Sequence, residues 1–144
     1  MNNKITSFHG PYRFLSNFWM CTVTYEGITF PSSEHAYQAA KTLNINARKS
    51  ISNCRTAGDS KREGNKLTRR PDWEEVKYQV MLDILTDKFK REPIRSWLKN
   101  TGKVGLTEFN TWHDLIWGVC ACSKCKNQGQ NLLGKALMEV RSKL

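Results

Sequence analysis

The spacing of apolar residues predicts two amphipathic helices in this chain. The first begins after Pro71, with Asp72 as its expected N-cap, because apolar positions then recur at helical intervals. These positions are Val76, Val80, Met81, Ile84, Leu85 and Phe89. The second helix is predicted over residues 131–144, where apolar and basic side chains separate onto opposite sides. Its expected inward residues are Leu133, Leu137 and Met138, and its expected outward residues are Lys135, Arg141 and Lys143.

A hairpin followed by a helix is predicted in the first third of the chain. Two short β-like segments, residues 22–25 and 28–30, flank a Glu-Gly turn. A proline and two serines end the second strand, and Ser33 is the expected N-cap of a helix that runs to about Leu43. The other predicted elements are two short helices over 47–70, one over 93–98 and a strand over 104–109. Together these elements predict a mostly helical α+β single domain over residues 1–144 with a small antiparallel sheet.

The length and composition favour an ordinary globular domain. The chain has 144 residues, of which 39% are hydrophobic, and no apolar run approaches the ~20 residues that span a bilayer. The first residues, Met1 to Thr6, have no apolar core, so we expect no signal peptide. We therefore predict a cytoplasmic protein without a membrane partner, and its oligomeric state is left open.

The charge is unevenly distributed. The chain carries a net charge of +10, and residues 48–70 hold eight Lys or Arg against two acids, which is a net charge of +6. A run of this kind is commonly a solvated helical face. The excess over the whole chain nevertheless favours a polyanionic partner or a phosphorylated ligand.

The five cysteines argue against a disulfide framework because their number is odd. Three of them cluster as Cys120-x-Cys122-x2-Cys125, whereas a structural zinc site needs four ligands. The candidates for a fourth ligand are Cys21, Cys54 and His113. Nothing in the spacing selects one of them, and His113, like His9, is interpreted as a lone histidine. We therefore favour free thiols and predict no metal and no cofactor.

The predicted helix over residues 33–41 carries a polar stripe. At ~100° per residue, Glu34, Gln38, Lys41 and Tyr37 fall on one side. Small alanines occupy the other side and allow close packing. The stripe ends in a carboxylate and an ammonium ~10 Å apart along the axis, a distance that can bracket a sugar. An isolated amphipathic helix would turn this stripe to solvent, so the pattern alone names no reaction.

The order of several motifs identifies a resemblance that covers nearly the whole chain. Two blocks are the most specific, and others lie before, between and after them in the same order. These blocks are Ser33-Glu34-His35-Ala36-Tyr37-Gln38 and Gly129-x-Asn131-Leu132-Leu133-Gly134, with Phe14-Leu15-Ser16-Asn17-Phe18 and Asp114-x2-Trp117-Gly118 among the others. The chain resembles the NADAR, or YbiA-like, family. One departure is visible after Trp117-Gly118, where family members usually carry glycine soon afterwards and this chain has Val119-Cys120-Ala121-Cys122.

The resemblance implies hydrolysis of an N-glycosidic bond at a ribose C1′. Family members act on ribosylamino-pyrimidine phosphates of riboflavin synthesis, or remove ADP-ribose from guanine in nucleic acid as antitoxins or phage counter-defences. By this resemblance the candidate catalytic residues are Glu34, Lys41 and Asp114. A carboxylate can stabilise the positive charge that develops on the sugar. Lys41 can protonate the departing base or form a Schiff base with the opened C1′ aldehyde, and both roles are left open.

Further residues are candidates for holding the substrate. Aromatic faces stack on bases, and cationic or amide side chains bind phosphate, although core packing and surface ion pairs explain such residues equally well. The substrate-binding candidates are Arg13, Asn17, Phe18, Trp73, Lys77, Trp117, Gly118 and Asn131.

Three functions compete at this stage. Removal of ADP-ribose from guanine in DNA or RNA is preferred, because clustered cations strengthen the binding of a polymeric substrate through counterion release. Cleavage of a small ribosylamino-pyrimidine phosphate, which needs only one or two cations, is the alternative. A module that binds ADP-ribose or single-stranded nucleic acid without turnover is the third.

Overall fold

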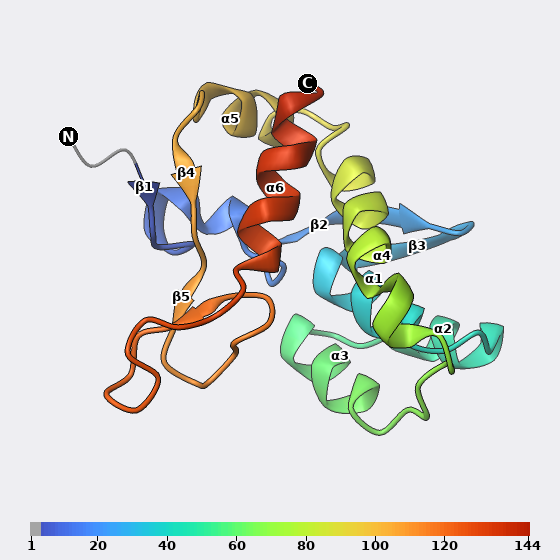
Figure 1. Ribbon diagram of the computed structural model, residues 1–144. Coiled ribbons are helices and arrows are strands. Elements are labelled where there is room, and N and C mark those ends of the chain that lie inside the picture. Colours follow the sequence, from blue (N-terminus) through green and yellow to red (C-terminus); the bar gives the residue numbers. More distant parts are fainter. Residues whose placement is uncertain (1–3) are drawn as a thin grey trace. The chain divides into compact units, whose positions relative to one another are not determined.

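The computed structural model describes residues 4–144, which form two compact units (Figure 1). One unit is Asn17–Arg91, and the other joins the residues up to Ser16 with Glu92–Leu144. The prediction about the first residues of the chain falls largely on residues 1–3, outside the described part. The prediction of one domain over 1–144 stays a prediction. None of the helices within 4–144 has the length and apolar character that a membrane span requires.

The Asn17–Arg91 unit is built from a hairpin and four helices. Its elements are β2 (Met20–Tyr25), β3 (Ile28–Ser32), α1 (Ser33–Ala40), α2 (Ile45–Ser52), α3 (Ala57–Gly64) and α4 (Trp73–Lys88). Strands β2 and β3 pair antiparallel around the Glu-Gly turn, so the predicted hairpin is confirmed. Helix α1 lies at the centre of this unit and packs against both strands and the three other helices. All eight of its residues are buried.

Helix α1 is capped by Ser32 rather than by Ser33. The Ser32 hydroxyl accepts the backbone N–H of His35 at 3.1 Å. The Ser33 hydroxyl instead donates to Asn17 Oδ1 at 2.9 Å, so the prediction of Ser33 as the N-cap is wrong by one residue. The helix also ends before Leu43, whose side chain is 61% exposed instead of packed.

Helix α4 follows the predicted apolar pattern but lacks the predicted cap. Val80, Met81, Ile84 and Leu85 are buried, as the spacing indicates. Asp72, the expected N-cap, makes no side-chain capping bond. Its carboxylate instead accepts hydrogen bonds from the Arg70 guanidinium at 2.6 and 2.9 Å, which holds the pKa of Asp72 below its usual range.

The described part of the second unit contains short strands, one 3-10 helix and two α-helices. Its elements are β1 (Lys4–Ile5), the 3-10 helix η1 (Gly10–Leu15), α5 (Ile94–Asn100), β4 (Gly105–Leu106), β5 (Phe109–Asn110), β6 (Val119–Cys120) and α6 (Leu132–Ser142). Strand β1 pairs parallel with β4, and β5 pairs parallel with β6. The single strand predicted over 104–109 is therefore two strands, because β4 and β5 have different partners. With the antiparallel hairpin of the other unit, these elements confirm the predicted α+β class.

A glycine and an asparagine tie α6 to β4. Asn131 adopts a left-handed conformation before the helix, and its side-chain amide donates to Leu106 O at 2.9 Å. Its Oδ1 accepts the backbone N–H of Glu108 at 3.1 Å. A Cβ on Gly134 would overlap both Leu106 O and the Asn131 side-chain amide. The Gly-x-Asn-x2-Gly block therefore has a structural function in this unit, apart from any contact with a ligand.

This close approach predicts an unusual effect of alanine in a helix. Gly134→Ala should lower the free energy of unfolding by about 1–3 kcal/mol, because overpacking outweighs the usual helical preference for alanine. Gly58 is the matched control, since its Cβ would make only ordinary contacts, 3.8 Å from the Thr56 hydroxyl and 4.0 Å from an Arg62 guanidinium nitrogen. Gly58→Ala should be neutral or stabilising in the same urea-denaturation series. Equal effects of both substitutions would contradict the packing account.

Candidate active site

Glu34 lies in the first turn of α1 as a buried carboxylate, 7% exposed. Its Oε2 accepts a hydrogen bond from Gln38 Nε2 at 2.6 Å, one helical turn later. Its backbone N–H donates to Asn17 O at 3.0 Å. The N-terminal end of a helix carries a partial positive charge that favours a carboxylate. The local structure therefore holds Glu34 in one orientation inside the unit.

Asn17 braces the start of α1 from outside the helix. Its carbonyl accepts the Glu34 N–H, and its Oδ1 accepts the Ser33 hydroxyl. Its Nδ2 points at Met81 Sδ, 3.7 Å away. Asn17 was a candidate for substrate binding, and the structure gives it a second function, which is to position the helix that carries Glu34.

Lys41 follows α1 directly and is also buried, with 4% of its surface exposed. The pKa of Lys41 is lowered to about 8, mainly by burial and also by the nearby cations Arg69 and Lys61, while Glu34 opposes the shift. Its Nζ lies 5.7 Å from the centre of the Tyr37 ring. The amine is therefore closer to its neutral form at physiological pH than an ordinary lysine.

The aromatic candidates of this unit differ in exposure. Trp73 is buried, and the centre of its ring lies 5.2 Å from that of Tyr37, so it packs against α1. Phe18 is 46% exposed and is accessible to a ligand. Lys77, a phosphate candidate, donates to Glu74 at 2.6 Å, and a phosphate would have to compete with that ion pair.

Gln38 and Gly64 belong to this site, although neither was among the sequence candidates. Gln38 Oε1 is buried and makes no hydrogen bond within residues 4–144. It lies against Gly64 at the end of α3, where a Cβ would overlap Oε1 and stand 2.7 Å from Gln38 Cβ. Gly64 thus leaves the room that Gln38 needs to reach Glu34. The position of Gln38 on the polar stripe was the signal for it, whereas nothing in the sequence singles out Gly64.

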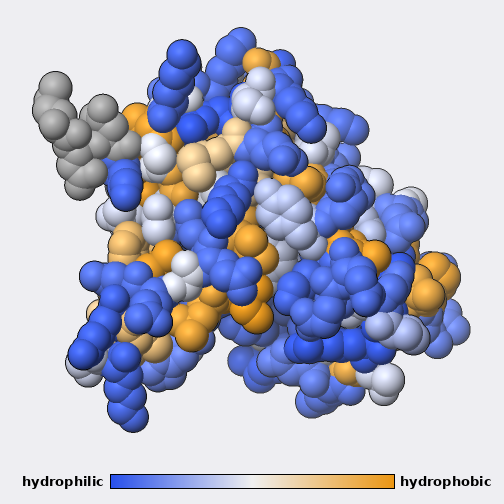
Figure 2. Space-filling view, viewed as in Figure 1, coloured by the Kyte–Doolittle hydropathy of each residue, from blue (hydrophilic) through white to orange (hydrophobic). Residues whose placement is uncertain are grey.

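The basic segment over residues 48–70 is largely ion-paired. Five of its eight cations contact an acid within 4.0 Å, and three of those acids lie outside the segment. The pairs are Arg48–Glu26, Arg62–Asp59, Lys66–Glu63, Arg69–Glu74 and Arg70–Asp72. Hydrophilic residues predominate on the face shown in Figure 2. The segment is therefore a weaker polyanion site than its charge count alone indicates.

The remaining candidates lie in the other unit, where Asp114 organises a loop. Asp114 Oδ1 accepts the backbone N–H groups of Ile116 and Trp117 at 3.1 and 2.9 Å. Two hydrogen bonds also join the Asn110 side chain to the Asp114 backbone. The predicted catalytic carboxylate thus has a structural function as well, because it fixes the turn that presents Trp117.

Gly118 is buried and serves close packing of the backbone. A Cβ there would stand 2.6 Å from both Glu108 O and Asn110 Nδ2. Gly129, at φ +146°, approaches Gly118 O so closely that a Cβ would overlap it. Arg13, the last candidate of this unit, is exposed near the end of η1.

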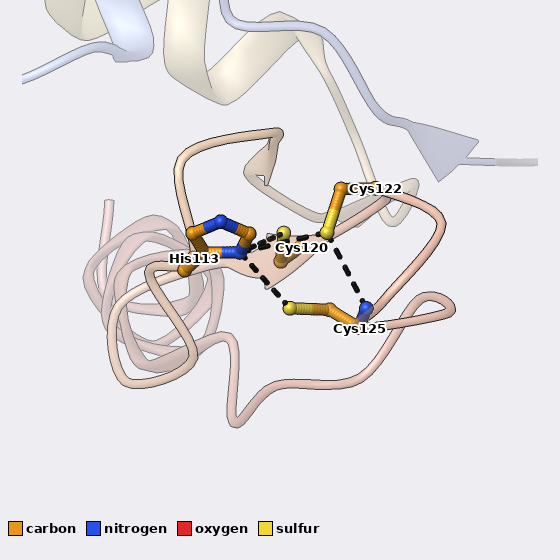
Figure 3. A group of neighbouring side chains, drawn as sticks. All are labelled: His113, Cys120, Cys122 and Cys125. Carbon is orange, nitrogen blue, oxygen red and sulfur yellow. Dashed lines mark hydrogen bonds between the residues drawn. The ribbon is translucent and has the colours of Figure 1, made fainter.

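His113 is not the lone histidine that its sequence position indicates. Its Nδ1 lies 3.3 Å from Cys125 Sγ, 3.5 Å from Cys122 Sγ and 3.7 Å from Cys120 Sγ (Figure 3). The interpretation of His113 as a lone histidine is wrong, because the segment between β5 and β6 brings its ring to the three cysteines.

Comparison with known proteins places these residues in a family. The chain matches the NADAR domain family over residues 6–144. It belongs to that family. The match includes residues of both units and confirms the resemblance on which the candidate residues rest.

Relatives of this NADAR chain are named as N-glycosidases or as riboflavin biosynthesis proteins. The N-glycosidase YbiA of Escherichia coli strain K12 is 34% identical over 150 residues, which cover 100% of this chain and 91% of that protein. The riboflavin biosynthesis protein VVA0006 of Vibrio vulnificus is 33% identical over 134 residues. That alignment covers 91% of this chain but only 35% of the Vibrio protein. The NMR structure of E. coli YbiA matches with a TM-score of 0.81 at 32% identity, covering 99% of this chain and 86% of the other.

The contact between Gln38 and Gly64 predicts a strong coupling in this NADAR chain. Gly64→Ala should lower the free energy of unfolding by about 1–3 kcal/mol through overpacking. In a Gln38→Ala background the same substitution should cost far less, since the overlapping side chain is gone. Urea denaturation of the four proteins in a double-mutant cycle measures this coupling. Additive effects would show that Gly64 does not set the position of Gln38.

Proposed function

We propose that this chain is an N-glycosidase that cleaves the bond between a ribose C1′ and a base nitrogen. The observation that carries the proposal is the pair of buried ionisable groups on α1 and directly after it. Glu34 is held by Gln38, and Lys41 has a pKa lowered to about 8. An amine with a pKa perturbed in this way is common at functional sites. The family membership and the names of the N-glycosidase relatives support the same reaction class.

Glu34 is proposed to stabilise the reacting sugar. As the C1′–N bond lengthens, positive charge develops on the ribose ring. A buried carboxylate stabilises that charge more strongly than a solvated one. The hydrogen bond from Gln38 keeps the carboxylate in place, so little reorganisation is needed in the transition state. Asp114, in the other unit, stays a candidate from the family resemblance alone.

Lys41 is proposed to act as a nucleophile through its neutral amine. With a pKa of about 8, roughly a tenth of this amine is neutral at pH 7, far more than for an ordinary lysine. The amine attacks C1′, the base leaves with the electron pair of the broken C–N bond and takes up a proton, and the sugar ring opens to an imine. Water then hydrolyses the imine and releases the sugar and the free amine.

The substrate class is proposed to be a phosphorylated riboside. The cations Arg69 and Lys61, which depress the pKa of Lys41, also favour an anionic group near it. A ribosylamino-pyrimidine phosphate fits these few charges, and the name of the Vibrio riboflavin biosynthesis relative supports it. The ion pairing of residues 48–70 moves the preference towards this small substrate.

ADP-ribosylated guanine in DNA or RNA is the second candidate substrate. The net charge of +10 favours it, as do Lys49, Arg55 and Lys61, the cations of the basic segment that form no ion pair in the part of the chain described. The exposed Phe18 ring offers a face on which a base can stack.

The reaction predicts a selective loss on replacing the carboxylate. Wild-type protein incubated with a ribosylamino-pyrimidine phosphate should release the free base. Mass spectrometry measures this release. Glu34→Gln should lower the turnover number by about a hundredfold or more while ligand binding stays measurable, because only the transition-state charge is lost. Glu75→Gln, an exposed substitution on α4, is the control and should leave turnover unchanged.

An ADP-ribosylated guanine oligonucleotide serves as the second substrate in the same assay. Release of ADP-ribose that falls steeply with salt, beside weak activity on the small riboside, would favour the polymer. Binding of both compounds without any release would replace the proposed hydrolase by a binding module. Full activity of Glu34→Gln would remove Glu34 from the mechanism.

The imine route predicts covalent trapping at Lys41. Borohydride added during turnover should fix the opened sugar on Lys41, and peptide mass mapping locates the adduct. The yield should rise as pH passes through about 8, since the attacking form is the neutral amine. Lys41→Arg should abolish the adduct, whereas Lys49→Arg on α2 should not. Activity that falls through the same pH range without any adduct would assign Lys41 as a proton donor instead.

A further inference from the structure

Four metal-binding side chains converge in the unit that contains Glu92–Leu144. One ligand atom from each of His113, Cys120, Cys122 and Cys125 lies within 4.8 Å of every other. Figure 3 shows the three sulfurs and the His113 ring nitrogen turned toward a common centre. They come from the turn before β6, from β6 itself and from the loop after it.

The distances fit a tetrahedral metal site. With metal–sulfur bonds of about 2.3 Å and a metal–nitrogen bond of about 2.0–2.1 Å, tetrahedral angles place the nitrogen about 3.5 Å from each sulfur. The distances from His113 Nδ1 to the three sulfurs are 3.3, 3.5 and 3.7 Å. The distances from the His113 nitrogen to all three sulfurs therefore match those of ligands on one ion.

Hydrogen bonding alone does not account for this arrangement. A single ring nitrogen has either one N–H or one lone pair, so it can make one good hydrogen bond with a thiol. Three sulfurs surround His113 Nδ1 at similar distances. A cation at the centre would instead give every one of the four groups a partner.

Backbone contacts fix the conformation of the cysteine loop. Cys120 forms an antiparallel bridge with Gln128, which closes the loop at its base. The Cys125 N–H donates to Cys122 Sγ at 3.3 Å, and Lys126 N–H donates to Cys122 O at 2.9 Å. Lys126 and the residue after it adopt left-handed conformations that turn the chain back. These contacts hold two sulfurs of the Cys-x2-Cys pair on the same side of the loop.

We propose that His113, Cys120, Cys122 and Cys125 form a Cys3His zinc site. Soft thiolates in a tetrahedral set with one imidazole select zinc among the common divalent ions. Four protein ligands complete the coordination, so the ion has a structural function and offers no open position for catalysis.

The ion would stabilise the loop around Asp114. His113 precedes Asp114 directly, and Cys120 lies in β6 just after Gly118. Coordination would therefore hold both ends of the segment that contains Trp117. The site stands on its own ligands and does not depend on the proposed glycosidase reaction.

Metal content tests the proposal on the full chain. The protein, purified under reducing conditions and passed through gel filtration, should retain about one zinc per chain by elemental analysis. Cys122→Ser and Cys125→Ser should each lose most of this zinc. Cys54→Ser is the matched control, because Cys54 lies in the other unit and outside the cluster, and it should retain the full amount.

Two readouts on the wild-type protein keep the test valid if a serine variant fails to fold. Cobalt exchanged for zinc should give the intense spectrum of tetrahedral cobalt–thiolate coordination. Native alkylation of the metal-loaded protein should label Cys21 and Cys54 and spare the other three thiols. Absence of bound metal with alkylation of all five thiols would overturn the site, as would a mass two hydrogens lower that reveals a disulfide. Neither readout measures glycosidase activity, so failure here and failure of the proposed function are distinguishable.

Discussion

The burial of Glu34 and Lys41 is the constraint on which the Asn17–Arg91 unit depends. Removing a carboxylate or an ammonium from water is costly unless the group is hydrogen-bonded or changes its protonation. The unit uses both solutions. Glu34 accepts a hydrogen bond from the Gln38 amide and lies in the first turn of α1. The pKa of Lys41 instead falls to about 8. The burial that costs stability is therefore also what raises the neutral fraction of the Lys41 amine.

The surroundings of α1 follow from this constraint. A helix with all eight residues buried needs neighbours on every side, and the hairpin, α2, α3 and α4 supply them. The Gln38 side chain has space because Gly64, which lies against it, has no Cβ. Position comes from Asn17, whose carbonyl and side chain hold the first turn. Gly64 and Asn17 thus decide where the Glu34 carboxylate lies.

The second unit is organised by side chains that replace missing regular structure. Its strands contain only two residues each, so backbone pairing alone satisfies few polar groups. Asn131 supplies two hydrogen bonds to the β4 segment, and Asp114 closes the turn before Gly118. The convergence of His113 on the cysteines belongs to the same pattern. A bound ion would add a further link of this kind between its loops.

Local patterns in the sequence were enough for the elements with strong periodicity. The hairpin, the apolar side of α4 and the α+β class followed from spacing and turn residues. The caps were less predictable, because Ser32 and Ser33 are chemically equivalent until Asn17 takes one of the two hydroxyls. Strand 104–109 was predicted as one element, since a sequence pattern does not state which partner each half will find.

The sequence by itself determined the family and the chemical types available, including the acid and amine of α1 and three clustered cysteines. The tertiary structure decided which of these groups are buried, paired or brought together. It buried a stripe that an isolated helix would expose, and it neutralised most of the basic segment with acids such as Glu26 and Asp72. It also brought His113 to Cys125 across a loop that spacing cannot predict. The physical reason is that desolvation and pairing depend on neighbours in space, which only the folded chain supplies.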